Sequence, residues 1–170
     1  MQFESDEILA IARDHFEHQR LEEALTRAKT LLELPEPPAG ARELAARIYA
    51  RLGLHERAIA LLSQCIERSP DALELRIELA MVSQDGGNLE QGLRLWDDLL
   101  VQHPLLPPAL FHAAALRAQR KQFADALRHV EVLLQTAEKD NLYVGKAREL
   151  QDALNRMVSG PEQVQEASMA

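Results

Sequence analysis

The fold of this chain is decided by residues 39–72, which read AGARELAARIYARLGLHERAIALLSQCIERSPDA. Apolar side chains recur there at spacings of three and four residues, as at Ile59, Leu62 and Ile66, which is the stripe of an amphipathic helix. Gly53 separates two such stripes, at a position where a helix ends and left-handed backbone is favoured. The segment is therefore predicted to form two helices joined by a tight turn.

The same pattern recurs along the chain with a period of 34 residues and without a gap. Repeats that begin at positions 5, 39, 73 and 107 place alanine at the eighth position every time. The twentieth position is also small, and a large aliphatic residue follows it. Two antiparallel helices pack closely only where small residues face the partner. We therefore expect both columns to be core, namely Ala12, Ala46, Ala80 and Ala114, with Ala24, Ala58, Gly92 and Ala126.

The boundaries of the repeats carry residues that end or begin helices. Gly53 and Gly87 lie between the two halves of their repeats, and Lys121 takes the place of glycine in the fourth. Pro70 and Pro104 follow the second halves, 34 residues apart, because proline cannot continue a helix. Each repeat is thus predicted to be one helix-turn-helix unit.

This pattern resembles the tetratricopeptide repeat family in its period and its small columns. The family's bulky twenty-fourth position is matched by Leu62 and Trp96, and its aromatic at the eleventh position by Tyr49. The resemblance implies an all-α fold, a right-handed α-solenoid of four helix-turn-helix repeats with a C-terminal capping helix. Terminal repeats in such proteins are commonly atypical.

The chain is predicted to form one domain, residues 1–158, with repeats at 5–38, 39–72, 73–106 and 107–140. Residues 141–158 are expected to form the capping helix. Its predicted inward residues are Leu142, Ala147, Leu150, Leu154 and Met157. Residues 159–170 lack a sustained apolar stripe, and we expect a flexible tail there.

Composition and charge argue against several classes of partner and location. The formal net charge is −8, so the average field repels phosphate backbones and acidic membrane surfaces. The single cysteine, Cys65, cannot form an internal disulfide, which favours a reducing compartment. The acidic N-terminus does not resemble a secretory signal, and no stretch approaches the roughly 18 apolar residues of a membrane helix. We therefore predict a cytoplasmic protein that binds neither nucleic acid nor membrane.

Candidate sites of catalysis or metal binding are weak. His15 and His18 are three residues apart on a helix, but two histidines alone do not make a metal site. Cys65 stands in a core column, and phosphate-binding loops and nucleophile motifs are missing from the sequence. We expect no enzymatic activity, no metal and no cofactor. A basic cluster near the turn of the fourth repeat is interpreted as a solvated helix end, and comprises Arg117, Arg120, Lys121 and Arg128.

The family resemblance places function on the first helix of each repeat, which lines a concave groove suited to a segment of another protein. Five columns of each repeat face that groove in the family. In this chain they predict a peptide-binding set of Arg13, Phe16, Glu43, Arg47, Arg51, Ile77, Met81, Gln84, Phe111, Ala115 and Gln119.

The predicted groove is basic at first and apolar later, which suggests a partner with an acidic stretch beside an apolar anchor. Ile77 and Met81 have an alternative interpretation, in which they simply pack against the next helix. Capture of a chaperone's carboxylate tail, known in the family, is disfavoured because Leu9 and Leu44 replace polar groups there. Glu74 and Glu78 would also repel a carboxylate ligand, a conclusion that again depends on the resemblance.

The leading functional hypothesis is a non-catalytic adaptor or scaffold that binds a segment of a partner protein in the groove. One alternative is a secretion-type chaperone, since such proteins are similarly small, acidic and built from these repeats. Another is a self-assembling structural protein and hence a homo-oligomer, in which the capping helix of one chain docks on the first repeat of the next. A regulatory module for a separate enzyme also remains open.

Overall fold

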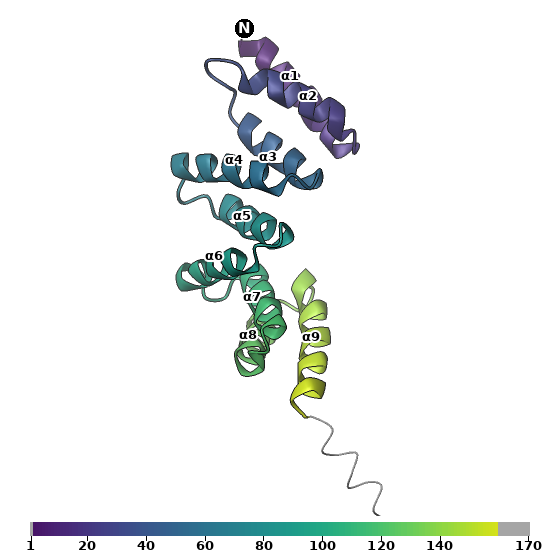
Figure 1. Ribbon diagram of the computed structural model, residues 1–170, viewed down its shortest axis with the longest axis vertical. Coiled ribbons are helices and arrows are strands. Elements are labelled where there is room, and N and C mark those ends of the chain that lie inside the picture. Colours follow the sequence, from purple (N-terminus) through teal and green to yellow (C-terminus); the bar gives the residue numbers. More distant parts are fainter. Residues whose placement is uncertain (1, 160–170) are drawn as a thin grey trace, which may run out of the picture. The chain divides into compact units, whose positions relative to one another are not determined.

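The computed structural model describes residues 2–159, with side chains from Glu4 onward, and Figure 1 shows its arrangement. The described part contains nine helices and no strand, as the all-α prediction requires. None of these helices combines the length and the hydropathy that crossing a bilayer requires. In chain order the helices are α1 (Gln2–Glu17), α2 (Leu21–Leu32), α3 (Ala41–Arg51), α4 (His55–Arg68), α5 (Leu73–Asp85), α6 (Leu89–Gln102), α7 (Pro107–Gln119), α8 (Phe123–Thr136) and α9 (Leu142–Val158).

The chain divides into two compact units at a point inside α6. Unit 1 is residues 1–92 and contains α1 to α5, whereas unit 2 is residues 93–170 and contains α7 to α9. In unit 1, α1 packs on α2 and α3 on α4, and α2–α3 and α4–α5 contacts join successive pairs. In unit 2, α7 packs on α8, and α9 packs on both. Each unit therefore buries its apolar stripes between consecutive helices.

The turn between the two helices has the same geometry in all four repeats. The residue in left-handed backbone is Gln19 (φ 61°), Gly53 (72°), Gly87 (84°) and Lys121 (61°), again 34 positions apart. Its N–H donates to the carbonyl three residues earlier at 3.0 Å, and the next N–H donates to the carbonyl five residues earlier at 2.8–3.1 Å. This bond pair defines a Schellman motif, which satisfies the last carbonyls of a helix.

The two glycines of this turn column behave as the sequence predicts, and the other two members show how strongly the fold imposes the turn. Gln19 and Lys121 adopt left-handed backbone although a Cβ makes it unfavourable by roughly 1–2 kcal/mol. Packing of the surrounding helix pair must offset this unfavourable energy. The helix pair therefore imposes the turn even where the residue is not glycine.

The small columns lie in the core, as predicted. Ala12, Ala46, Ala80 and Ala114 are each 0% exposed, as are Ala24, Ala58 and Ala126, while Gly92 is also buried. Unit 1 has two apolar clusters, one around α1 to α3 and one around α3 to α5, and unit 2 has one around α7 to α9. The close approach of the helices therefore depends on alanine at these positions.

Asn141 is the N-cap of the capping helix α9, and its side chain accepts a hydrogen bond from the N–H of Tyr143 at 2.9 Å. Ala147 and Leu154 are buried as predicted, and Leu150 is half-buried. The inward placement of Leu142 and Met157 is wrong, since they are 71% and 60% exposed. For Leu142 the reason is helical phase: the inward face is set by Val144, Ala147 and Leu154, and Leu142 precedes Val144 by half a turn. Met157 shares the face of Leu154 but lies in the last turn of α9, where its side chain is exposed. Most of the predicted tail, residues 160–170, lies outside the described residues.

Candidate functional site

The first helices of unit 1 carry a set of accessible side chains, which we call the first-helix face. It consists of the predicted groove residues on α1, α3 and α5. Arg13, Arg51 and Met81 are exposed, and the others are partly exposed, so none of the eight is buried. The buried alanines lie behind them on the same helices. The members of the first-helix face are Arg13, Phe16, Glu43, Arg47, Arg51, Ile77, Met81 and Gln84.

Arg13 extends from α1 across the start of α3. A Cβ built on Gly40, the residue before α3, would lie only 2.7 Å from Nη2 of Arg13. Gly40 also has left-handed backbone, with φ 84°. Glycine at this position therefore suits the left-handed backbone, and a side chain there would make the guanidinium of Arg13 shift.

Arg47 joins α3 to α5 through Glu78. Its Nε donates to Oε1 of Glu78 at 2.8 Å, and its Nη2 lies 2.7 Å from the same oxygen. The pKa of the Arg47 guanidinium is raised, chiefly by its hydrogen bond to Glu78, with further contributions from the charges of Glu78, Glu43 and Glu74. A single guanidinium thus interacts with three carboxylates, and its charge is already paired.

A cavity of about 410 Å³ opens beside this ion pair, and we call it the Arg47 cavity. It lies where the start of α3 meets the start of α5 and the loop before it. Ala72, Leu73 and Leu75 supply an apolar part, and two glutamates supply carboxylates. Its lining residues are Glu43, Arg47, Ser69, Ala72, Leu73, Glu74 and Leu75.

The remaining members of the first-helix face divide into polar and apolar contacts. Arg51 donates a hydrogen bond from Nη2 to Oε1 of Gln19, so α3 is tied to the turn after α1. Met81 is 37% exposed and Ile77 is partly exposed, one helical turn apart on α5. Both therefore keep apolar surface that a partner can cover.

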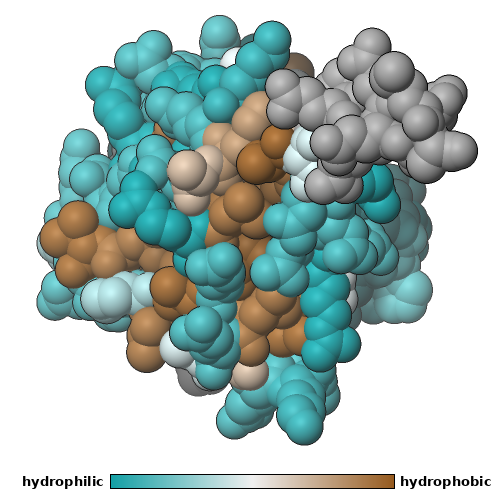
Figure 2. Space-filling model, turned by 90° about the horizontal axis from the view of Figure 1, so that it is seen from below, coloured by the Kyte–Doolittle hydropathy of each residue, from teal (hydrophilic) through white to brown (hydrophobic). Residues whose placement is uncertain are grey.

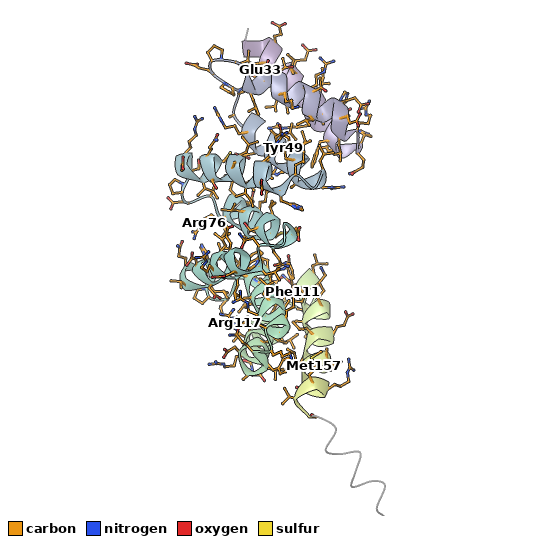
Figure 3. The ribbon with its side chains drawn as sticks, in the orientation of Figure 1. Glu33, Tyr49, Arg76, Phe111, Arg117 and Met157 are labelled. Atoms are coloured by element: carbon orange, nitrogen blue, oxygen red, sulfur yellow. The ribbon has the colours of Figure 1, made fainter. Side chains whose placement is uncertain are left out.

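In unit 2 the predicted groove residues lie on α7, and only part of their surface is open. Figure 3 labels Phe111 on α7 beside α9. Its ring centroid is 5.5 Å from that of Tyr143, and the ammonium of Lys146 lies 5.9 Å from it. Phe111 therefore packs against the capping helix, a contact that the repeat pattern alone does not reveal. Ala115 is partly exposed and Gln119 is exposed.

The basic cluster of the fourth repeat is partly neutralised within the chain. Nη2 of Arg117 lies 2.9 Å from each carboxylate oxygen of Asp97, and Arg128 pairs with Asp125. Figure 3 labels Arg117 on the side of α7 away from α9. The cluster therefore offers less free positive charge than its sequence suggests.

The residues considered for chemistry have structural roles. Nδ1 of His18 lies 2.8 Å from the carbonyl oxygen of Asp14 at the end of α1, and His15 is partly buried. In the part of the chain that the structure describes, no three His, Cys, Asp or Glu side chains form a group that could hold a metal ion. Cys65 is buried, and this burial raises the pKa of its thiol, which disfavours the reactive thiolate.

Comparison with known proteins identifies the repeat. Residues 9–72 match the family model described as tetratricopeptide repeat, and no curated protein is similar enough in sequence to count as a relative. A tetratricopeptide repeat protein from Parabacteroides merdae superposes with a TM-score of 0.74 at 17% identity, covering 89% of this chain and 60% of that one. MamA (41-end) from Desulfovibrio magneticus RS-1 gives 0.71 at 11% identity, covering 98% and 97%. YrrB, described as a TPR protein with an unusual peptide-binding site, gives 0.69 at 16% identity, covering 81% and 71%.

These similarities agree with the repeated helix pairs, the recurrent Schellman turn and the buried alanine columns. The chain is an all-α helical-repeat protein of the solenoid class. Within that class, residues 9–72 match the tetratricopeptide repeat, and the fold is similar to that of solved tetratricopeptide repeat proteins. Such repeats are scaffolds for protein–protein interaction.

Proposed function

We propose that this chain is a non-catalytic adaptor, and that it binds a segment of a partner protein on the first-helix face of unit 1. The observation that carries the proposal is the contrast along these helices. The alanine columns are fully buried, whereas Ile77 and Met81 keep accessible apolar surface beside charged groups. A peptide-binding face requires accessible apolar surface together with polar groups at defined positions. The peptide-binding site in YrrB's description supports the same class of ligand.

The proposal predicts that the apolar residues on α5 contribute to peptide binding. Twelve-residue peptides are first selected from a random display library against the whole chain. The double variant Ile77→Ser with Met81→Ser should bind the selected peptides about tenfold more weakly, because partly burying two apolar side chains is worth roughly 1–2 kcal/mol. Fluorescence polarisation measures the affinity, and circular dichroism verifies that helicity is retained.

The matched control removes similar apolar surface elsewhere. Val101 and Leu105, at and after the end of α6, are 81% and 58% exposed. Val101→Ser with Leu105→Ser should leave peptide affinity unchanged. Selected peptides that bind the Ile77 and Met81 variant as tightly as the parent chain would contradict the placement of the site.

A second candidate function is self-association through apolar side chains near the C-terminal end of α9. Met157 and Val158, at the end of α9, are 60% and 58% exposed, and Figure 3 labels Met157 there. Figure 2 shows apolar side chains gathered on the view from that end. If this surface joins copies of the chain, the mass measured by light scattering should rise with concentration and fall for Met157→Lys with Val158→Lys. A constant monomer mass would exclude this candidate.

A further inference from the structure

We propose that the Arg47 cavity receives a lysine or arginine side chain, so that the segment bound by unit 1 is basic. This inference rests on the proposed peptide-binding function and names the chemistry of its ligand. It also reverses the charge that the sequence suggested, because Arg13, Arg47 and Arg51 alone favour an acidic partner.

The first argument is that the positive charge of Arg47 is not available. Its Nε and Nη2 both engage Oε1 of Glu78, and Oε2 of that carboxylate is buried without a hydrogen-bond partner. An incoming acidic side chain would have to compete with Glu78 for the guanidinium. It would also leave the partly buried Glu78 carboxylate, whose side chain is 28% exposed, without its cation, which is unfavourable.

The second argument is that the two carboxylates lining the cavity have no ion pair of their own, although both lie within the field of Arg47. Glu43 and Glu74 both line it, and among the ion pairs of the described residues none involves either of them. With Arg47 paired to Glu78, the lining therefore carries two negative charges in excess. A lysine ammonium or an arginine guanidinium is the side-chain group that complements them.

The third argument is the composition of the lining. Ala72, Leu73 and Leu75 line the cavity together with the two glutamates, so the lining is both apolar and acidic. Lysine and arginine bury their aliphatic stems against apolar surface and keep the charged head among polar groups. The cavity therefore suits both parts of such a side chain, and a single inorganic cation would leave its apolar lining unused.

The fourth argument is the distribution of charge along the chain. Residues 1–92 hold 17 Asp and Glu and 10 Lys and Arg, a net charge of −7, whereas residues 93–170 hold 10 and 9. Nearly all the net negative charge of the protein, −7 of −8, therefore belongs to unit 1. This field attracts a basic segment to unit 1 and increases its rate of association.

In the test, random twelve-residue peptides from a display library are selected for binding to the whole chain. The frequencies of lysine and arginine in the selected peptides are then counted. We expect them at about three times their frequency in the unselected library. The affinity of a selected peptide for Glu43→Gln with Glu74→Gln should be about tenfold weaker, and substitution of its lysines and arginines by glutamine should cause a similar loss. The control Glu56→Gln with Glu67→Gln removes two exposed charges from α4 in the same unit and should change affinity less than twofold.

The outcomes separate this inference from the function on which it rests. Peptides enriched in acidic residues, or basic peptides equally sensitive to both glutamine variants, would overturn the basic-ligand cavity. If those peptides still lose affinity for Ile77→Ser with Met81→Ser, the first-helix face remains the binding site. Peptides indifferent to that variant as well would reject the proposed function itself.

Discussion

Replacement of Trp96 by alanine should lower the free energy of unfolding by about 3–5 kcal/mol, the range measured for removal of a large buried side chain. Trp96 lies on α6 within unit 2 and is 0% exposed. Its ring stacks on that of His112 on α7, with centroids 4.8 Å apart and planes 8° from parallel. Alanine would therefore lose the apolar transfer energy, the ring contact and the packing around the resulting cavity. Urea denaturation followed by circular dichroism measures the loss.

Two further variants show whether the loss arises from burial of the indole. Trp96→Phe keeps an aromatic ring and should lose less than half as much stability, because it leaves a smaller cavity. Val101→Ala shortens a side chain of the same helix that is 81% exposed and should change stability by less than about 0.5 kcal/mol. A loss below about 1 kcal/mol for Trp96→Ala would show that the ring is not packed in the core.

Trp96 also illustrates how much of the fold the sequence predicts. Its position in the twenty-fourth column, shared with Leu62, identifies it as core, and both residues are fully buried. Cys65 is assigned to the core by the same register. These predictions succeed because a gapless 34-residue period determines which side of each helix is inward. Periodicity alone carries that information.

The repeat pattern does not determine the contacts made where it ends or where two helices exchange charges. Leu142 is predicted inward on α9, but no later repeat fixes the phase of that helix, and Met157 is exposed because it lies in the last turn. Phe111 belongs to a groove column, yet it packs on Tyr143 because α9 lies beside α7. Register identifies the column of a residue but not which neighbouring helix covers it.

The pairing of Arg47 with Glu78 is the contact, not evident from sequence, that matters most for the proposed function. The residues are 31 positions apart on α3 and α5, so only the distance between those helices brings them together. From sequence, three arginines in groove columns suggested a basic surface. The structure shows that one of them is already neutralised, and that Glu43 and Glu74 remain beside it. The charge that a groove offers to a ligand therefore depends on which of its residues already form ion pairs within the chain.

Replacing an alanine of the eighth column by a larger residue should also destabilise the protein, as removal of the large Trp96 side chain does. We expect Ala46→Leu to lower the free energy of unfolding by about 1–3 kcal/mol, because extra methylene groups in a packed core force side chains and backbone apart. Ala46 on α3 is 0% exposed and belongs to the same cluster as Ala58 and Leu62 on α4. Alanine and leucine both favour helices, so propensity contributes only a small part of the loss.

The control for this substitution is Ala60→Leu, at an exposed position on α4, which should change stability by no more than about 0.5 kcal/mol. Thermal and urea unfolding of the two variants separate crowding from the general effect of a larger side chain. A neutral Ala46→Leu would mean that α3 and α4 can move apart without loss. The small column would then not set the distance between the helices of a pair, and the strict recurrence of alanine every 34 residues would lose its physical explanation.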